Sequence, residues 1–167
     1  MKKLFLTLIF IIGFSVFGSV IDASAQTKCA VLPFKNAYGD MKMNIWSYRL
    51  QDSLLQALSA LDPEGENFTF IPIDEIEDEL AQLNMDPSNP QYETDMWNAV
   101  VGLGAELVVM GDFNFKNERF LINAYVVDVK TKLRNQKRQA RNIFKKEKDI
   151  MKSVPIMVKK LKKIFVK

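Results

Sequence analysis

Two β-rich segments joined by a short polar turn constrain the fold of this chain more than any other feature. Residues 107–115 begin Leu-Val-Val-Met, residues 120–129 are rich in β-branched and aromatic side chains, and Lys116-Asn117-Glu118 lies between them. Such segments are typical of adjacent antiparallel strands. Residues 133–144 follow with many basic side chains, which suit a solvated edge strand because charge discourages unwanted pairing. The chain is therefore expected to contain three consecutive antiparallel strands.

Strand and helix patterns precede this unit, and a helical pattern follows it. The expected strands lie at 28–34 and 68–71, and the expected helices at 44–61, 74–83, 92–101 and 150–165. The last helix is amphipathic and basic. The order β-α-β-α-α-β-β-β-α predicts an α+β fold, a single domain in which helices pack on a mixed β-sheet.

Several residues are expected to define helix ends. Asn44 is placed to cap the amino terminus of the first helix. Gly102 and Gly104 follow the third helical pattern, where left-handed backbone is common. Pro155 falls inside the last helical pattern, and a proline there removes a hydrogen bond. Either Ser153 caps a helix that begins at this point, or the helix bends at Pro155.

The amino terminus has the three parts of a cleavable export signal. Lys2 and Lys3 precede an apolar run over residues 4–21, and Ala23-Ser24-Ala25 ends it. An uncleaved membrane anchor is the alternative, and the small-residue site favours cleavage near Ala25. Cys29 does not directly follow a small-residue box, which argues against lipidation. We expect residues 1–25 to be a signal peptide and residues 26–167 to be one domain, located in the periplasm or exported.

The chain lacks the usual groups of catalytic and metal sites. It has no histidine, which removes the commonest general base and the commonest zinc ligand, and a single cysteine, Cys29, which cannot form an internal disulfide. Asp74 and Glu77 belong to an acidic cluster, but acidic residues at a helix amino terminus complement its dipole. We expect no catalytic residues, no metal, no cofactor and no small-molecule substrate, and Cys29 is expected to be a buried strand residue.

Charge is distributed unevenly along the sequence. Residues 26–129 carry 6 Lys and Arg against 17 Asp and Glu, whereas residues 130–167 carry 15 against 2. This asymmetry indicates either a contact between the two halves or a basic surface offered to an anionic partner. Nucleic acid is not the expected partner, because the basic segment lacks interleaved aromatic residues. The candidate residues for partner or membrane binding are Lys159, Lys160, Lys162, Lys163, Arg138 and Arg141.

Three motifs occur along the chain in the order in which known protein families have them. They are Ala-Val-Leu-Pro-Phe at 30–34 with Asn36 and Gly39-Asp40 after it, Leu-Gly-Ala-Glu-Leu-Val-Val-Met-Gly-Asp at 103–112, and Ala-Tyr-Val-Val-Asp-Val-Lys-Thr at 124–131. Together they resemble the TolB amino-terminal domain and FlgO-like proteins, and more distantly the penicillin-binding-protein activator and curli secretion lipoproteins. The resemblance spans nearly all of residues 26–167. In these motifs Gly104 and Gly111 are expected to permit backbone turns, and Asp128 to begin one.

The resemblance implies a bacterial cell-envelope domain that binds other proteins without catalysis. The TolB propeller, a tetratricopeptide array and a lipid anchor have no counterpart in these residues, so neither partners nor binding residues are carried over. The leading hypothesis is an exported accessory protein that binds an envelope protein partner. The alternative is a peripheral membrane-surface protein held by the basic helix within residues 148–167, with its lysines on anionic headgroups. An enzyme is the least favoured class.

Overall fold

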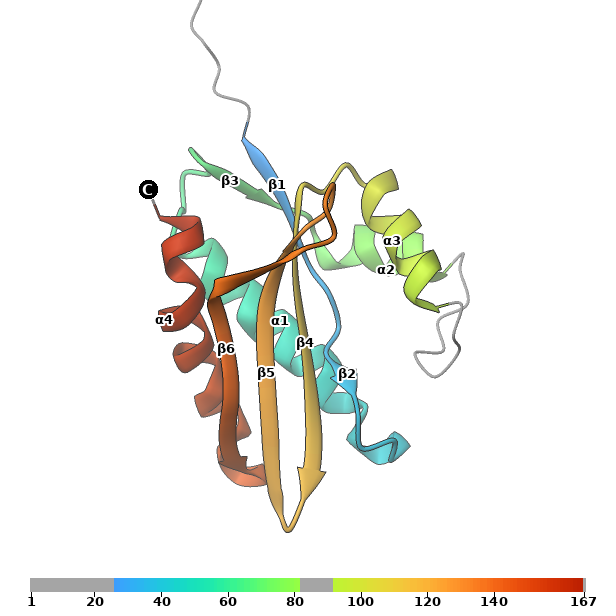
Figure 1. The fold of residues 1–167 in the computed structure, drawn as a ribbon, viewed down its shortest axis with the longest axis vertical. Helices are drawn as coiled ribbons and strands as arrows, with labels where there is room; N and C mark the ends of the chain where they lie inside the picture. Colours follow the sequence, from blue (N-terminus) through green and yellow to red (C-terminus); the bar gives the residue numbers. More distant parts are fainter. Residues whose placement is uncertain (1–25, 82–91, 167) are drawn as a thin grey trace, which may run out of the picture.

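The computed structural model describes residues 26–81 and 92–166, and Figure 1 shows its fold. The expected signal peptide and its cleavage site, residues 1–25, lie outside the described residues.

The centre of the molecule is a mixed sheet, as predicted, and it has six strands where the sequence predicted five. Its main path runs β3-β1-β4-β5-β6, and the short β2 continues beside β4. Strands β1, β2 and β3 run parallel to their neighbours, while β4, β5 and β6 are antiparallel. The strands are β1 (Thr27–Val31), β2 (Lys35–Asn36), β3 (Phe68–Phe70), β4 (Leu107–Lys116), β5 (Arg119–Asp128) and β6 (Arg134–Lys146).

Helices cover both faces of the sheet (Figure 1). Helices α1 and α4 pack side by side on one face, and α2 and α3 lie together on the other. The predicted α+β class and the order of its main elements are therefore confirmed. The helices are α1 (Ile45–Ser59), α2 (Ile73–Ala81), α3 (Tyr92–Gly102) and α4 (Val154–Phe165), with 3₁₀ turns η1 (Met41–Met43) and η2 (Glu147–Ser153).

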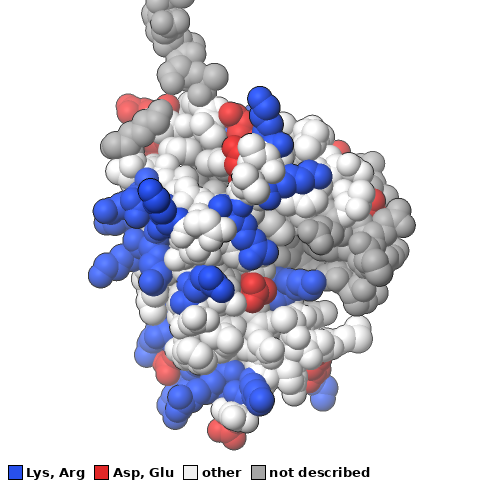
Figure 2. Space-filling view, viewed as in Figure 1, with Lys and Arg blue, Asp and Glu red and all other residues white. Residues whose placement is uncertain are grey.

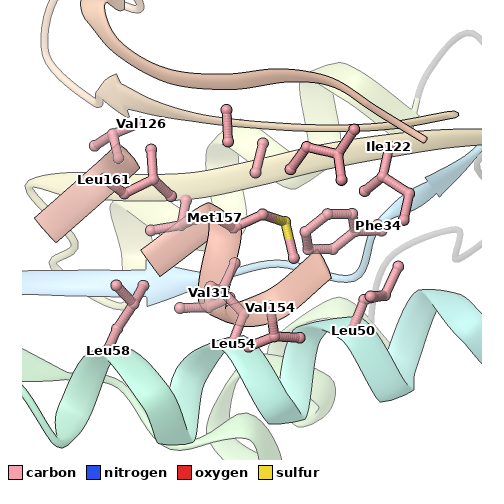
Figure 3. Packing of buried hydrophobic residues seen from close by; sticks show 14 of the residues in the cluster. Val31, Phe34, Leu50, Leu54, Leu58, Ile122, Val126, Val154, Met157 and Leu161 are labelled. Atoms are coloured by element: carbon pink, nitrogen blue, oxygen red, sulfur yellow. The ribbon is translucent and has the colours of Figure 1, made fainter. Parts of the chain in front are cut away.

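Two hydrophobic cores hold the layers together. In the larger core, Leu50, Leu54 and Leu58 of α1 point toward Met157 and Leu161 of α4 and toward the strands (Figure 3). The smaller core lies on the opposite face, where Ile76 of α2 and Val100 of α3 meet the apolar side chains of β1, β4 and β5. Side chains that alternate along β4 and β5 enter one core or the other, because successive residues of a strand point to opposite faces.

The antiparallel unit forms as its pattern predicts. Asn117 and Glu118 connect β4 to β5 with φ of 52° and 58°, the left-handed pair of a two-residue hairpin turn that matches the twist of the strands. Between β5 and β6, Asp128 Oδ1 accepts hydrogen bonds from the Thr131 backbone N–H and hydroxyl, at 2.7 and 2.8 Å. These bonds hold the pKa of Asp128 below its usual value, and the predicted turn at Asp128 is confirmed.

The expected helix ends are corrected in part. Asn44 occupies the position before α1, but its side chain does not cap the helix, since Asn44 Oδ1 instead accepts a 2.7 Å hydrogen bond from Asn36 Nδ2. Gly104 adopts left-handed backbone, with φ of 71°. Gly102 does not, because it is the last residue of α3 itself. Helix α4 begins at Val154 with Pro155 in its first turn, where the missing N–H does no harm, and the Ser153 hydroxyl donates to Ile150 O at 2.6 Å without capping.

Gly111 does not form a turn, contrary to the sequence-based expectation. It lies in the middle of β4, opposite Ala124 of β5, with its open side facing Phe34. A Cβ at position 111 would lie 2.2 Å from Phe34 Cε1. Gly111 is therefore needed so that the Phe34 ring can pack directly against the strand at this position.

Candidate protein interface

Helix α4 separates its apolar and basic side chains cleanly. Val154, Met157, Leu161 and Phe165 are buried in the larger core, at the three- and four-residue spacing of one helical face. Phe165 also stacks edge-on against Phe68 of β3, with ring centroids 5.2 Å apart. Ile156, Val158 and Ile164 are half-buried at the margins of this face, and the opposite side of the helix faces solvent. All four predicted lysines lie there and are exposed, namely Lys159, Lys160, Lys162 and Lys163.

The other two candidate residues lie on the neighbouring strand. Helix α4 packs against β6, which forms one edge of the sheet. Arg141 of β6 is exposed and Arg138 is half-buried. In Figure 2 the Lys and Arg side chains gather on the side of the molecule where α4 and β6 lie. The structure thus places all six predicted residues on two adjacent elements, and we call them the basic surface.

The charges of the basic surface have no counter-ions in the part of the chain that the structure describes. Within residues 26–81 and 92–166, none of the six side chains forms an ion pair. The ion pair nearby joins Lys152 Nζ to Asp149 Oδ1 at 2.6 Å, and it holds the pKa of the Asp149 carboxyl below its usual value. The acidic helix α2 belongs to the opposite face of the sheet. Of the two explanations of the charge asymmetry, the structure therefore favours a basic surface that faces outward.

A solvent-open hollow adjoins two of these lysines. Pro155, Ile156, Lys159 and Lys160 line it, and its volume is about 630 Å³. All four residues come from one exposed strip of α4, so the hollow is a surface depression and not an enclosed substrate pocket. The charge pattern of the sequence indicated the lysines but not Pro155 and Ile156. Pro155 and Ile156 lie four residues before Lys159 and Lys160, on the same helical face, and this spacing was the sequence signal that could have identified them.

Neither a metal-holding cluster nor a membrane-spanning helix is found in the described residues. In this part of the chain no group of three or more Asp, Glu or Cys side chains is arranged to hold a metal ion. Asp74 and Glu77 are exposed on α2, consistent with a solvated helix face. None of the helices in the described ranges is long and apolar enough to cross a bilayer.

Cys29 is a buried strand residue, as predicted. Its side chain is 0% exposed in β1, which is flanked by β3 and β4, and burial raises the pKa of the thiol far above its ordinary value. A thiolate therefore forms rarely in the folded protein, and an intermolecular disulfide through Cys29 would require unfolding.

We expect Cys29 to resist alkylation in the native state. With iodoacetamide at pH 8, Cys29 should react about a thousandfold more slowly than an exposed thiol, because reaction must wait for opening of the structure. A Thr69→Cys variant supplies the exposed thiol, since Thr69 lies on the neighbouring strand β3 and faces solvent. Mass spectrometry of timed samples measures both rates. Equal rates at the two positions would contradict the buried position of Cys29.

Comparisons with known proteins bear on the fold. No protein-family model matches the sequence, and no curated protein matches it. Lipoprotein GNA1162 from Neisseria meningitidis has a similar structure, with a TM-score of 0.53 and 15% identity over 80% of this chain and 94% of that one. The two chains share a fold. The expectation of a lipoprotein-like fold is confirmed to that extent, while the FlgO-like resemblance stays a prediction.

Two further structures match less well. The LpoB C-terminal domain from Salmonella enterica has a TM-score of 0.46 and 14% identity, over 72% of this chain and 83% of that domain. TolB from Acinetobacter baumannii has a TM-score of 0.39 and 15% identity, over 79% of this chain and 26% of TolB.

Proposed function

We propose that this chain is a non-catalytic, exported accessory protein of the cell envelope that binds an anionic protein partner through the basic surface. One observation carries the proposal. The apolar side of α4 is committed to the core, and its four lysines face solvent without counter-ions among the described residues. Side chains so placed contribute little to the stability of the isolated protein, which leaves them available for recognition. The fold shared with GNA1162, a lipoprotein, supports a location in the envelope.

Attachment to a membrane through α4 is the alternative function, and the packing of α4 limits it. Insertion of an amphipathic helix requires its apolar face to enter the acyl boundary. In α4 that face includes Met157 and Leu161, each 0% exposed. Only attraction between the lysines and anionic headgroups remains for a folded domain, and salt weakens that attraction. We therefore place protein binding first.

Charge reversal on α4 tests the proposal. The variant carries Lys159→Glu, Lys160→Glu, Lys162→Glu and Lys163→Glu, and tagged protein is cross-linked in cells of the source organism and recovered for mass spectrometry. If each exposed ion pair contributes ~0.5 kcal/mol, loss of four weakens binding by ~2 kcal/mol, about 30-fold. We expect one recurrent envelope protein with the native chain and its loss from the variant.

Two matched controls separate charge from structure. Replacing the same four lysines by arginine keeps the charge and should keep the partner. Lys35→Glu with Lys42→Glu, at exposed lysines near β2 and η1, reverses charge away from the basic surface and should also keep it. A partner retained by the α4 variant would overturn the proposed surface. Recovery of lipid alone, or vesicle binding that persists in high salt, would favour the membrane alternative.

A further inference from the structure

Among the described residues, α2 and α3 cover only part of the face of the sheet opposite α1 and α4, which we call the outer face. Helices α2 and α3 pack on the half that contains Ala30, Leu32, Val108 and Val127. The half nearer the β4–β5 turn has no described helix in front of it (Figure 1). There, the residues that alternate with the buried side chains of β4, β5 and β6 point outward. We call this set the open face: Asn114, Lys116, Arg119, Leu121, Phe144 and Lys146.

A row of three register positions crosses the open face, and we call it the apolar row because two of its three side chains, Leu121 and Phe144, are apolar. Strand register places Asn114 opposite Leu121, and Leu121 opposite Phe144. Phe144 is 60% exposed, whereas Phe113 and Phe120, which point to the opposite face of the sheet, are completely buried in the larger core. An exposed aromatic side chain beside a half-buried leucine provides the apolar contact that anchors interfaces.

A basic row lies next to the apolar row. Lys116 pairs with Arg119, and Arg119 pairs with Lys146, so three cations stand side by side on adjacent strands. Like charges directly opposite each other destabilise a sheet. None of the three forms an ion pair among the described residues. The isolated protein therefore carries a repulsion that an anionic partner would relieve.

On the side of the apolar row away from the basic row, polar groups form hydrogen bonds with one another. Asn123 Nδ2 donates to Asp112 Oδ1 at 2.7 Å, and the Asn142 backbone N–H donates to Asn123 Oδ1 at 2.9 Å. Next to them Arg134 is exposed, and its guanidinium lies 3.8 Å from the Tyr125 ring centroid. Cations thus lie on both sides of the apolar row. In the space-filling view, uncharged atoms occupy this part of the face, and both basic and acidic side chains lie around them (Figure 2).

From this arrangement we infer that the open face is a second docking surface, one that binds an extended acidic segment of a partner protein. The basic and apolar rows are two residues apart along each strand, about 6.8 Å. That distance equals the spacing of alternate side chains in an extended peptide, so one apolar side chain can rest on Phe144 while a carboxylate two residues away reaches the basic row. The open face is distinct from the basic surface of α4 and β6, and the inference extends the proposed function to a second contact.

Site-specific photo-cross-linking tests this inference in cells of the source organism. Phe144 is replaced by photoreactive benzoylphenylalanine in the full-length chain. A matched variant carries the same group at Tyr48, which is 44% exposed on α1 beneath the opposite face of the sheet. We expect a protein adduct at position 144 and none at position 48, with an excess of Asp and Glu in the cross-linked peptide.

Charge variants are then made in the position-144 protein. Arg119→Glu with Lys146→Glu should reduce the adduct about tenfold or more, whereas Arg119→Lys with Lys146→Arg should keep it. Arg119→Gln should reduce the adduct and raise the denaturation midpoint of the isolated protein, because it removes the central repulsive charge. A purely structural role for Arg119 would not produce these opposite effects.

Any other result at position 144 overturns the inference. Absence of an adduct at position 144, or an adduct that survives charge reversal in folded protein, excludes an acidic docking segment. A cross-linked lipid would indicate a membrane surface, and a cross-linked peptide of this chain would indicate self-association. The same group placed at Lys159 reports on the basic surface. If an adduct forms from position 144 but none forms from position 159, the proposed function is refuted and this inference stands.

Discussion

Gly111→Ala is expected to lower the free energy of unfolding by about 3 kcal/mol. The new methyl carbon would lie 2.2, 2.4 and 2.6 Å from three atoms of the Phe34 ring. Phe34 is 1% exposed and packed among α1, α4 and the sheet, so the ring cannot move without displacing its neighbours (Figure 3). Urea denaturation of residues 26–167, followed by circular dichroism, measures the change.

Two companion variants show whether the ring is the cause. A Cβ at position 102 would lie 3.2 Å from Glu79 Oε1, which is the end of a flexible side chain. Gly102→Ala should therefore change the free energy of unfolding by no more than about 1 kcal/mol. Phe34→Leu should relieve the clash, and Gly111→Ala should destabilise that background by at least ~1 kcal/mol less than it destabilises the native chain. Additive effects of the two substitutions would contradict the contact between Gly111 and Phe34.

Leu161→Ala is expected to cost about 3 kcal/mol of unfolding free energy. Leu161 is 0% exposed on the inner side of α4, in the core formed with α1 and the sheet. Truncation removes buried methyl groups and leaves a cavity that the packed neighbours fill only in part. The same urea titration measures this loss, with an unchanged slope expected if the two-state transition is preserved.

The adjacent residue provides the control. Lys162 is exposed on the outer side of the same helix, and Lys162→Ala should change stability by no more than about 0.5 kcal/mol. Similar small effects at both positions would mean that α4 does not belong to the core. Its apolar face would then be available for a bilayer, and the membrane alternative would replace protein binding as the leading hypothesis.

Both results bear on function, because the basic surface depends on where α4 is held. The core contacts of α4 decide which of its side chains face solvent, and its packing against β6 makes the strand that carries Arg138 and Arg141 its neighbour. A charge-reversed α4 should therefore remain folded while it loses its partner. A variant in which the packing of α4 is destabilised should lose both its folded structure and its partner.

Local patterns in the sequence were sufficient for the elements. β-branched and aromatic residues predicted the hairpin, and position after the hairpin together with basic side chains predicted the edge strand. Helical spacing separated the buried and basic sides of α4. The two-residue β2 and the 3₁₀ turns escaped prediction because so short a segment has no period. The side chain of Asn44 also escaped, since its bond to Asn36 depends on how the β2 segment returns to α1.

The sequence by itself determined the α+β class, the burial of Cys29 and the identity of the basic residues, because composition and period act within one segment. Only the tertiary structure decided that Gly111 accommodates Phe34, that the lysines of α4 lack counter-ions among the described residues, and that Phe144 stands exposed beside a basic row. Each of these depends on the register between segments far apart in the chain. That register is set by packing of the whole sheet against its helices, which no local pattern encodes.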